Sequence, residues 1–131
     1  MKSEKQFNQW LTKQFYEASK TKVCVQRIET TTGNGVPDLL VIQPSKILLI
    51  ESKFETRNIR PEQGAFQIKA NEIIRDGNNV CCTLCAYPKT NRLIYQTYNA
   101  MSITENGIEP TETIEFTLDA NGFANFLTQI K

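Results

Sequence analysis

Two short apolar segments joined by a four-residue turn decide the fold of this chain of 131 residues. The sequence reads Asp38-Leu39-Leu40-Val41-Ile42, then Gln43-Pro44-Ser45-Lys46, then Ile47-Leu48-Leu49-Ile50-Glu51-Ser52-Lys53. Aliphatic runs bounded by turn residues predict strands over 39–42 and 47–54. The second run holds four consecutive apolar residues, which is typical of a strand buried on both faces. We therefore expect a hairpin in the interior of a sheet.

The length of the turn predicts which residues of this hairpin face each other. With residues 43–46 as the turn, Ile42 faces Ile47 and Asp38 faces Glu51. Two like charges directly opposed across a strand pair destabilise it, unless a cation cancels them. Because side chains alternate along a strand, Lys53 lies on the same face as Glu51. One end of the hairpin is therefore expected to present Asp38, Glu51 and Lys53 together.

These residue types fit hydrolysis of a phosphodiester without histidine. Hard cations such as Mg²⁺ take oxygen ligands, so Asp38, Glu51 and the backbone carbonyl of Ser52 are the candidate ligands. Lys53 is the candidate group to position or deprotonate the attacking water, or to stabilise charge on the phosphorus oxygens. Spacing alone leaves a second interpretation open, in which Lys53 and Asp38 form a salt bridge without a catalytic role.

The flanking segments predict helices and further strands. Ser3 and Gln6 form a capping-box pattern before a helix over 4–19, whose apolar residues recur at helical spacing. A second helix is predicted from Pro61 to a cap at Asp76-Gly77. Further strands are predicted over 22–30, 80–87, 93–101 and 113–118, a loop over 104–112, and a closing helix over 119–130. This order indicates one α/β domain over 1–131, with a central mixed sheet flanked by helices.

The composition excludes several classes of chemistry. The chain has no histidine, so Ser-His-Asp and Cys-His relays and His-ligated metal sites are excluded. Residues 1–69 hold 11 basic and 7 acidic groups, whereas residues 70–131 hold 4 basic and 7 acidic groups. A polyanion is therefore expected to bind the first half. We see no signal peptide and no membrane-spanning run, and we expect a cytoplasmic protein.

The four cysteines do not predict a metal site. Cys82 and Cys85 have the spacing of half a zinc site, but only Cys24 and Cys81 remain as further ligands. Cys81 and Cys82 are adjacent, so they point to opposite faces of a strand. We interpret all four as reduced thiols in the core. A redox or zinc protein that uses Cys82 and Cys85 remains an alternative function.

Three motifs follow one another in this sequence: Gly35-Val36-Pro37-Asp38, the apolar strand that ends in Glu51-Ser52-Lys53, and Pro61-Glu62-Gln63. Their combination resembles the PD-(D/E)XK nuclease superfamily, and most closely its VRR-NUC branch of Holliday junction resolvase-like domains. The resemblance covers about residues 3–85 and implies a restriction-endonuclease-like core, which the strands and helix of 86–131 complete. The acidic segment from Met101 to Lys131 has no counterpart that we can place.

The resemblance also implies roles for individual residues. It makes Asp38 and Glu51 metal ligands, Lys53 the catalytic lysine, and Gln63 a residue that supports the site from the second helix. It makes Glu4 the carboxylate of the first helix that aids metal or water binding. Glu17 lies on the same predicted helix and competes with Glu4 for this role.

The function that the resemblance implies is a metal-dependent DNA endonuclease that acts as a homodimer, with branched or flapped DNA as candidate substrates. Mg²⁺ is the expected cofactor, Mn²⁺ the expected substitute, and no organic cofactor is expected. Candidate phosphate contacts are Arg57, Arg60, Lys22 and Arg27. The alternative is a module on the same fold that binds nucleic acid or protein without cleaving.

Overall fold

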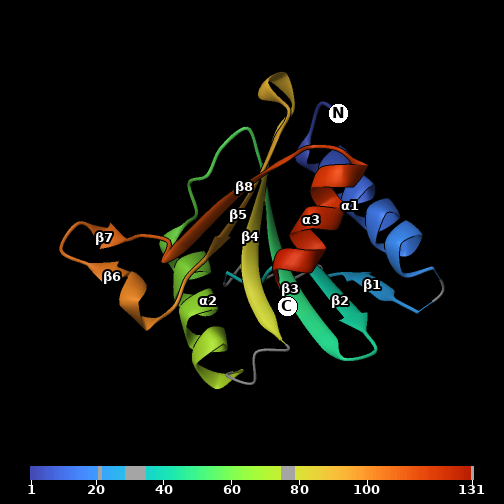
Figure 1. Cartoon of the computed structure of the whole chain (residues 1–131). Helices are drawn as coiled ribbons and strands as arrows, with labels where there is room; N and C mark the ends of the chain where they lie inside the picture. The colour runs from blue at the N-terminus through green and yellow to red at the C-terminus, as the bar shows by residue number, and fades with distance from the viewer. Residues whose placement is uncertain (21, 29–34, 75–78, 131) are drawn as a thin grey trace.

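The computed structural model describes residues 1–20, 22–28, 35–74 and 79–130, and its centre is a mixed sheet of six strands (Figure 1). The strand order is β1-β2-β3-β4-β5-β8, with β3 and β4 parallel and every other neighbouring pair antiparallel. The strands are β1 Cys24–Arg27, β2 Leu39–Gln43, β3 Lys46–Phe54, β4 Val80–Tyr87, β5 Arg92–Thr97 and β8 Glu112–Thr117. The predicted α/β fold with a central mixed sheet is confirmed.

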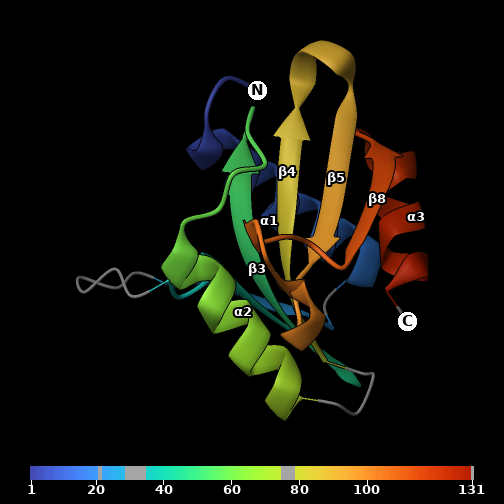
Figure 2. The ribbon, with the colours of Figure 1, turned by 90° about the vertical axis from the view of Figure 1, so that its left-hand side faces the viewer.

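Helices cover both faces of this sheet. The helices are α1 Glu4–Ser19, α2 Pro61–Ile73 and α3 Ala120–Gln129. Helix α2 lies on one face, whereas α1 and α3 lie together on the other, as the two perpendicular views show (Figures 1 and 2). Among the described residues, no helix is both long and apolar enough to cross a membrane.

The predicted register of the β2–β3 hairpin is confirmed. Ile42 pairs with Ile47, Leu40 with Leu49, and Leu39 with Ile50. Residue 38 lies just before β2, and its backbone carbonyl accepts a hydrogen bond of 2.7 Å from the Ile28 amide. The short turn therefore brings Asp38 level with the segment of β3 that contains Glu51.

The apolar core lies between the sheet and the pair α1 and α3. Strands β2 to β5 turn alternate apolar residues toward these helices, and α1 and α3 contribute four phenylalanines. The rings of Phe15 and Phe123 meet edge to face with centroids 4.9 Å apart, and Phe123 and Phe126 are 5.6 Å apart. Burial of these rings is the main stabilising contribution on this side of the sheet.

The start of α1 follows the prediction with one difference. Ser3 Oγ accepts a hydrogen bond of 3.2 Å from the Gln6 amide, as a helix cap does. The Gln6 side chain, however, accepts a hydrogen bond of 2.6 Å from the amide of Lys2, so the reciprocal half of the predicted capping box does not form.

Several boundaries differ from the predictions. Strand β5 ends at Thr97 and a 3-10 turn follows over Ala100–Ser102, so the predicted strand over 93–101 was too long. The predicted loop over 104–112 was wrong, because it contains part of a small hairpin, β6 Ile103–Thr104 and β7 Gly107–Ile108. Strand β1 is shorter than the predicted 22–30, and residues 29 and 30 and the predicted cap at Asp76-Gly77 lie outside the described residues.

Candidate metal centre

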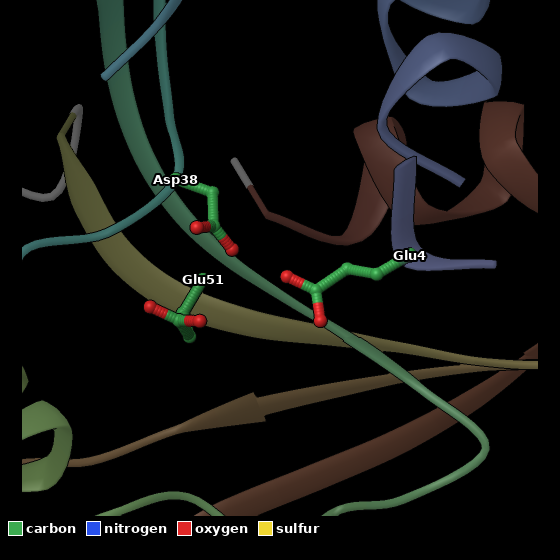
Figure 3. Close-up of side chains that lie close together, drawn as sticks. All are labelled: Glu4, Asp38 and Glu51. Atoms are coloured by element: carbon green, nitrogen blue, oxygen red, sulfur yellow. The ribbon is translucent and has the colours of Figure 1, made fainter. Parts of the chain in front are cut away.

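Three carboxylates from different parts of the chain converge at the end of the β2–β3 hairpin. Each of Glu4, Asp38 and Glu51 offers one carboxylate oxygen, and the three oxygens lie within 4.8 Å of one another. Glu4 reaches from the first residue of α1 toward Asp38 and Glu51 (Figure 3). Of the two candidate carboxylates of the first helix, it is Glu4 that the fold places here. Glu17 is exposed and lies 3.9 Å from Lys13.

Asp38 is held by hydrogen bonds from β3, the strand that carries Glu51. The backbone amide and the hydroxyl of Ser52 both donate to Asp38 Oδ2, at 3.0 and 2.8 Å. Ser52 is fully buried, so these two hydrogen bonds fix one oxygen of Asp38 and leave the other for a ligand. The sequence predicts a role for the Ser52 carbonyl alone, and nothing in it indicates that the Ser52 side chain orients Asp38.

Glu51 is a buried carboxyl group among like charges. Its side chain is 3 % exposed, and burial, followed by the neighbouring Asp38 carboxylate, raises the pKa of Glu51 to about 8. Lys53 Nζ lies 3.9 Å from Glu51 Oε2 and acts in the opposite direction on this pKa. Within the described residues Lys53 pairs with Glu51 and not with Asp38, so the structural salt bridge considered above does not form.

The pKa of Glu4 is shifted in the same direction as that of Glu51. Burial and the charge of Asp38 raise the pKa of Glu4, while the charges of Lys53 and Arg27 lower it. Burial and the nearby Asp38 carboxylate therefore disfavour the ionised forms of Glu4 and Glu51, and a bound cation would favour them. Three carboxylate oxygens at this separation match the oxygen ligands that Mg²⁺ and Mn²⁺ prefer, so a divalent cation fits the residues present.

Helix α2 is seated against the loop that leads to Asp38. Gly35 has φ +77°, and a Cβ at this position would lie 2.2 Å from the backbone oxygen of Glu62. Glycine is therefore required both for the left-handed backbone and for the close approach. Gln63, predicted to support the site, is 5 % exposed, and its Oε1 accepts a hydrogen bond of 2.8 Å from the Arg60 amide. Its observed contact therefore caps α2 and does not touch the carboxylates.

A second glutamine of α2 lies beneath the site. Gln67 is 1 % exposed and its Nε2 donates to Thr83 Oγ1 at 2.7 Å. Thr83 is the partner of Glu51 in the β3–β4 register. This places Glu51 on the face of the sheet that α2 covers. The sequence shows that Gln67 is one helical turn after Gln63. It does not show that Gln67 contacts Thr83 of β4.

The predicted phosphate contacts are distributed unevenly around the cluster. Arg27 is exposed and close enough to Glu4 to lower its pKa. Arg57 and Lys22 are exposed, and Arg60 is exposed and lies 3.4 Å from Glu62. Of the four residues, Arg27 is therefore the one with an evident electrostatic link to the carboxylates.

The cysteines form no metal site within the described residues, and the thiols are free. Cys81, Cys82 and Cys85 are buried in β4, as predicted. Burial raises the pKa of Cys81 and of Cys85 to about 12, so neither is a reactive thiolate near neutral pH. The prediction for Cys24 was wrong, because this residue is exposed on β1.

Comparison with known proteins supports the fold. No protein-family model matches the sequence, and no curated protein matches it. Among solved structures, the chain is similar to Hjc, a Holliday junction resolvase from the archaeal hyperthermophile Archaeoglobus fulgidus. The superposition has a TM-score of 0.58 and covers 96% of this chain and 99% of the resolvase, with 12% sequence identity. The chain thus has the fold of this archaeal resolvase along nearly its whole length.

Proposed function

We propose that this protein is a metal-dependent DNA endonuclease of the PD-(D/E)XK type, related to the VRR-NUC branch. The observation that carries the proposal is the Glu4, Asp38 and Glu51 cluster with Lys53 beside it. The fold that it shares with a Holliday junction resolvase supports a nuclease and makes branched DNA the first substrate to test.

The carboxylates account for the binding of a cation. Asp38 and Glu51 would hold Mg²⁺ or Mn²⁺, with Glu4 and the backbone carbonyl of Ser52 as further ligands. Held by these residues, a divalent cation would supply Lewis acidity toward the phosphoryl oxygens and toward water. Ser52 keeps the Asp38 carboxylate oriented through its two hydrogen bonds, so little reorganisation is needed when the ion arrives.

Lys53 accounts for the remaining chemistry. Its side chain is 14% exposed, so its ammonium acts in a partly water-excluded site where its charge is weakly screened. There it stabilises the negative charge that develops on the phosphoryl oxygens, and it orients the attacking water. Gln63 supports the site by capping the start of α2, which abuts the Gly35 loop before Asp38.

The resemblance to dimeric nucleases leads us to propose that a single domain over 1–131 pairs as a homodimer, which would present two sites to two DNA strands. Arg57, Arg60, Lys22 and Arg27 are proposed to contact phosphates in a sequence-independent way. Sedimentation of the free protein tests the dimer separately from the cleavage reaction.

The test is cleavage of plasmid, flap, four-way junction and single-stranded DNA in Mg²⁺ and in Mn²⁺. We expect cleavage by the wild type that is abolished by chelation and lost in Asp38→Ala, Glu51→Ala and Lys53→Ala. Glu17→Ala is the matched control, because it removes an exposed carboxylate of the same helix that carries Glu4. Metal-dependent binding of DNA without any product would instead support a non-cleaving module, and equal nicking by all variants would contradict the proposed site.

A further inference from the structure

A pocket of about 330 Å³ lies next to the carboxylate cluster, between α1 and the edge of the sheet. Its lining is formed by Asn8, Gln9, Thr12, Lys13, Arg27 and Leu39. Asn8 is one helical turn after Glu4, Leu39 directly follows Asp38, and Arg27 is the strand partner of Leu39. Asn8 therefore lies on the same helix face as Glu4, and Leu39 and Arg27 lie beside Asp38 at the start of β2. The pocket thus adjoins the carboxylate cluster.

A buried amide in this pocket lacks a partner. Asn8 is 4 % exposed, and its Oδ1 has no hydrogen-bond donor among the described residues. An unpaired buried oxygen of this kind opposes folding. The nearby Thr12 hydroxyl does not donate to this oxygen, because it donates to the backbone carbonyl of Asn8 at 2.8 Å. The amide of Asn8 is therefore available to a ligand that brings a donor into the pocket.

The charged residues of the pocket favour an anion. Lys13 and Arg27 are both exposed and stand on opposite walls, on α1 and β1. Lys13 is 3.9 Å from Glu17, but both side chains are more than half exposed, so this pair contributes little and the lysine can turn to a ligand. Leu39 belongs to the buried core and contributes the apolar part of the lining.

We infer that this pocket binds one nucleotide of the DNA strand, adjacent to the phosphate at the carboxylate cluster. The inference rests on the proposed function and names a second contact region for the same substrate. Lys13 and Arg27 bind the phosphate, and Asn8 pairs with a donor of the base. Glu4 and Asn8 are four residues apart on α1, a rise of about 6 Å at about 1.5 Å per residue. Successive nucleotides of one stacked strand are about 3.4 Å apart, so a neighbouring nucleotide reaches the pocket.

The experiment measures DNA affinity in the full chain with Lys53→Ala, so that binding is separated from cleavage. Fluorescence anisotropy with labelled single-stranded and junction DNA in Mg²⁺ is recorded at several salt concentrations. Asn8→Leu removes the amide and keeps the number and branching of the side-chain heavy atoms, and Lys13→Gln removes one charge. Lys69→Gln is the matched control, since Lys69 is an exposed lysine of α2 on the other face of the sheet.

We expect Asn8→Leu to weaken DNA binding about tenfold, the loss of one good contact to a base. The same variant is expected to melt at an equal or higher temperature, because it removes an unpaired buried oxygen. Lys13→Gln is expected to weaken binding and to reduce the salt slope by about 0.7–0.9, whereas Lys69→Gln changes neither quantity. The shift in melting temperature on adding Mn²⁺ stays as in the parent for all three variants.

Parent-like affinity in both Asn8→Leu and Lys13→Gln, or an equal loss in Lys69→Gln, would overturn the inference. If Asn8→Leu fails to fold, Lys13→Gln still decides, because it alters an exposed side chain. DNA binding that depends on Asn8 and Lys13 in a protein that never cleaves contradicts the proposed function but supports the pocket. A parent without measurable DNA affinity contradicts both.

Discussion

The two faces of the sheet differ in what they bury. The face under α1 and α3 carries aliphatic and aromatic side chains, and the described residues place no charged group in its core beside the phenylalanines. The face under α2 carries a polar row across four strands, in which each residue is the register partner of the next: Glu51, Thr83, Gln96 and Thr113. The interior of the first face has the residues expected for stability. The second face carries Glu51, and α1 contributes Glu4 to the cluster from its first turn.

The polar face is also costly to fold. Gln67 and Gln96 each keep a buried side-chain oxygen without a partner among the described residues, whereas on the α1 side only Asn8 does so in that part of the chain. Glu51 is in addition buried beside Asp38. Unpaired polar groups and like charges in the interior oppose folding. We therefore expect substitutions on the two faces to separate activity from stability, and the following experiments test that division.

The largest effect is expected from Asp38→Asn on the polar face. Loss of this carboxylate should reduce DNA cleavage by more than about 100-fold, since it removes a ligand on which the charge stabilisation depends. Thermal unfolding in EDTA should change little, while the stabilisation by Mn²⁺ should disappear, which calorimetric titration can verify. If Asp38→Asn instead unfolds the protein without any metal effect, the division between the faces fails.

On the apolar face, Phe126→Ala should destabilise the protein by about 3–5 kcal/mol, because it leaves a cavity among Tyr95, Phe116 and Phe123. Denaturant unfolding measures this loss. Cleavage per folded molecule, assayed well below the melting temperature, should remain that of the wild type. A specific activity that falls in proportion would show that the apolar face also positions the site.

A pair of glycines tests how α2 is seated. Gly35→Ala combines backbone strain of about 1–2 kcal/mol with a clash against Glu62 that adds about 1–3 kcal/mol. Gly107→Ala is the control, because Gly107 also has a positive φ, +108°, but a Cβ there meets nothing within 4 Å. Gly35→Ala should therefore lower both stability and cleavage, and Gly107→Ala should cost only the strain. Equal effects would argue against the seating of α2 on this loop.

The smallest effect is a dependence of stability on pH. The pKa of Glu51 is about 8 in the folded protein against 4.5 as its ordinary value, so the folded state keeps a proton that the unfolded state releases. Stability of the metal-free protein therefore falls as the pH rises from about 4.5 to 8. Glu51→Gln should remove this loss and melt several degrees higher at pH 8.5, with no difference at pH 4. Identical melting at pH 8.5 would contradict the raised pKa.

The hairpin and its register could be predicted because they are local. A turn of four residues and two apolar runs determine which residues of β2 and β3 face each other. The small hairpin β6–β7 could not be predicted, because two-residue strands carry no periodicity. The choice between Glu4 and Glu17 also required the structure, since both lie on α1 and only the docking of that helix brings Glu4 to Asp38. Exposure of Cys24 on β1 likewise follows from the position of that strand at the edge of the sheet.

The site residues show the same limit. Asp38, Glu51 and Lys53 follow from alternation along two strands, whereas the hydrogen bonds from Ser52 to Asp38 depend on how the chain enters β2. The unpaired oxygen of Asn8 has no signal in the sequence, because polar residues in helices are usually exposed.

The parallel pairing of β3 with β4 has a kinetic consequence. Parallel neighbours need a long connection, and here it contains the whole of α2, whereas β2 and β3 are joined by a short turn. Hairpins form within about 1–10 μs, and pairings between distant segments form more slowly. We therefore expect Asp38 and Glu51 to meet early in folding, before Glu4 and the covering helix α2 reach their places. Repulsion between the first two carboxylates thus acts on the rate of folding as well as on the stability of the final structure.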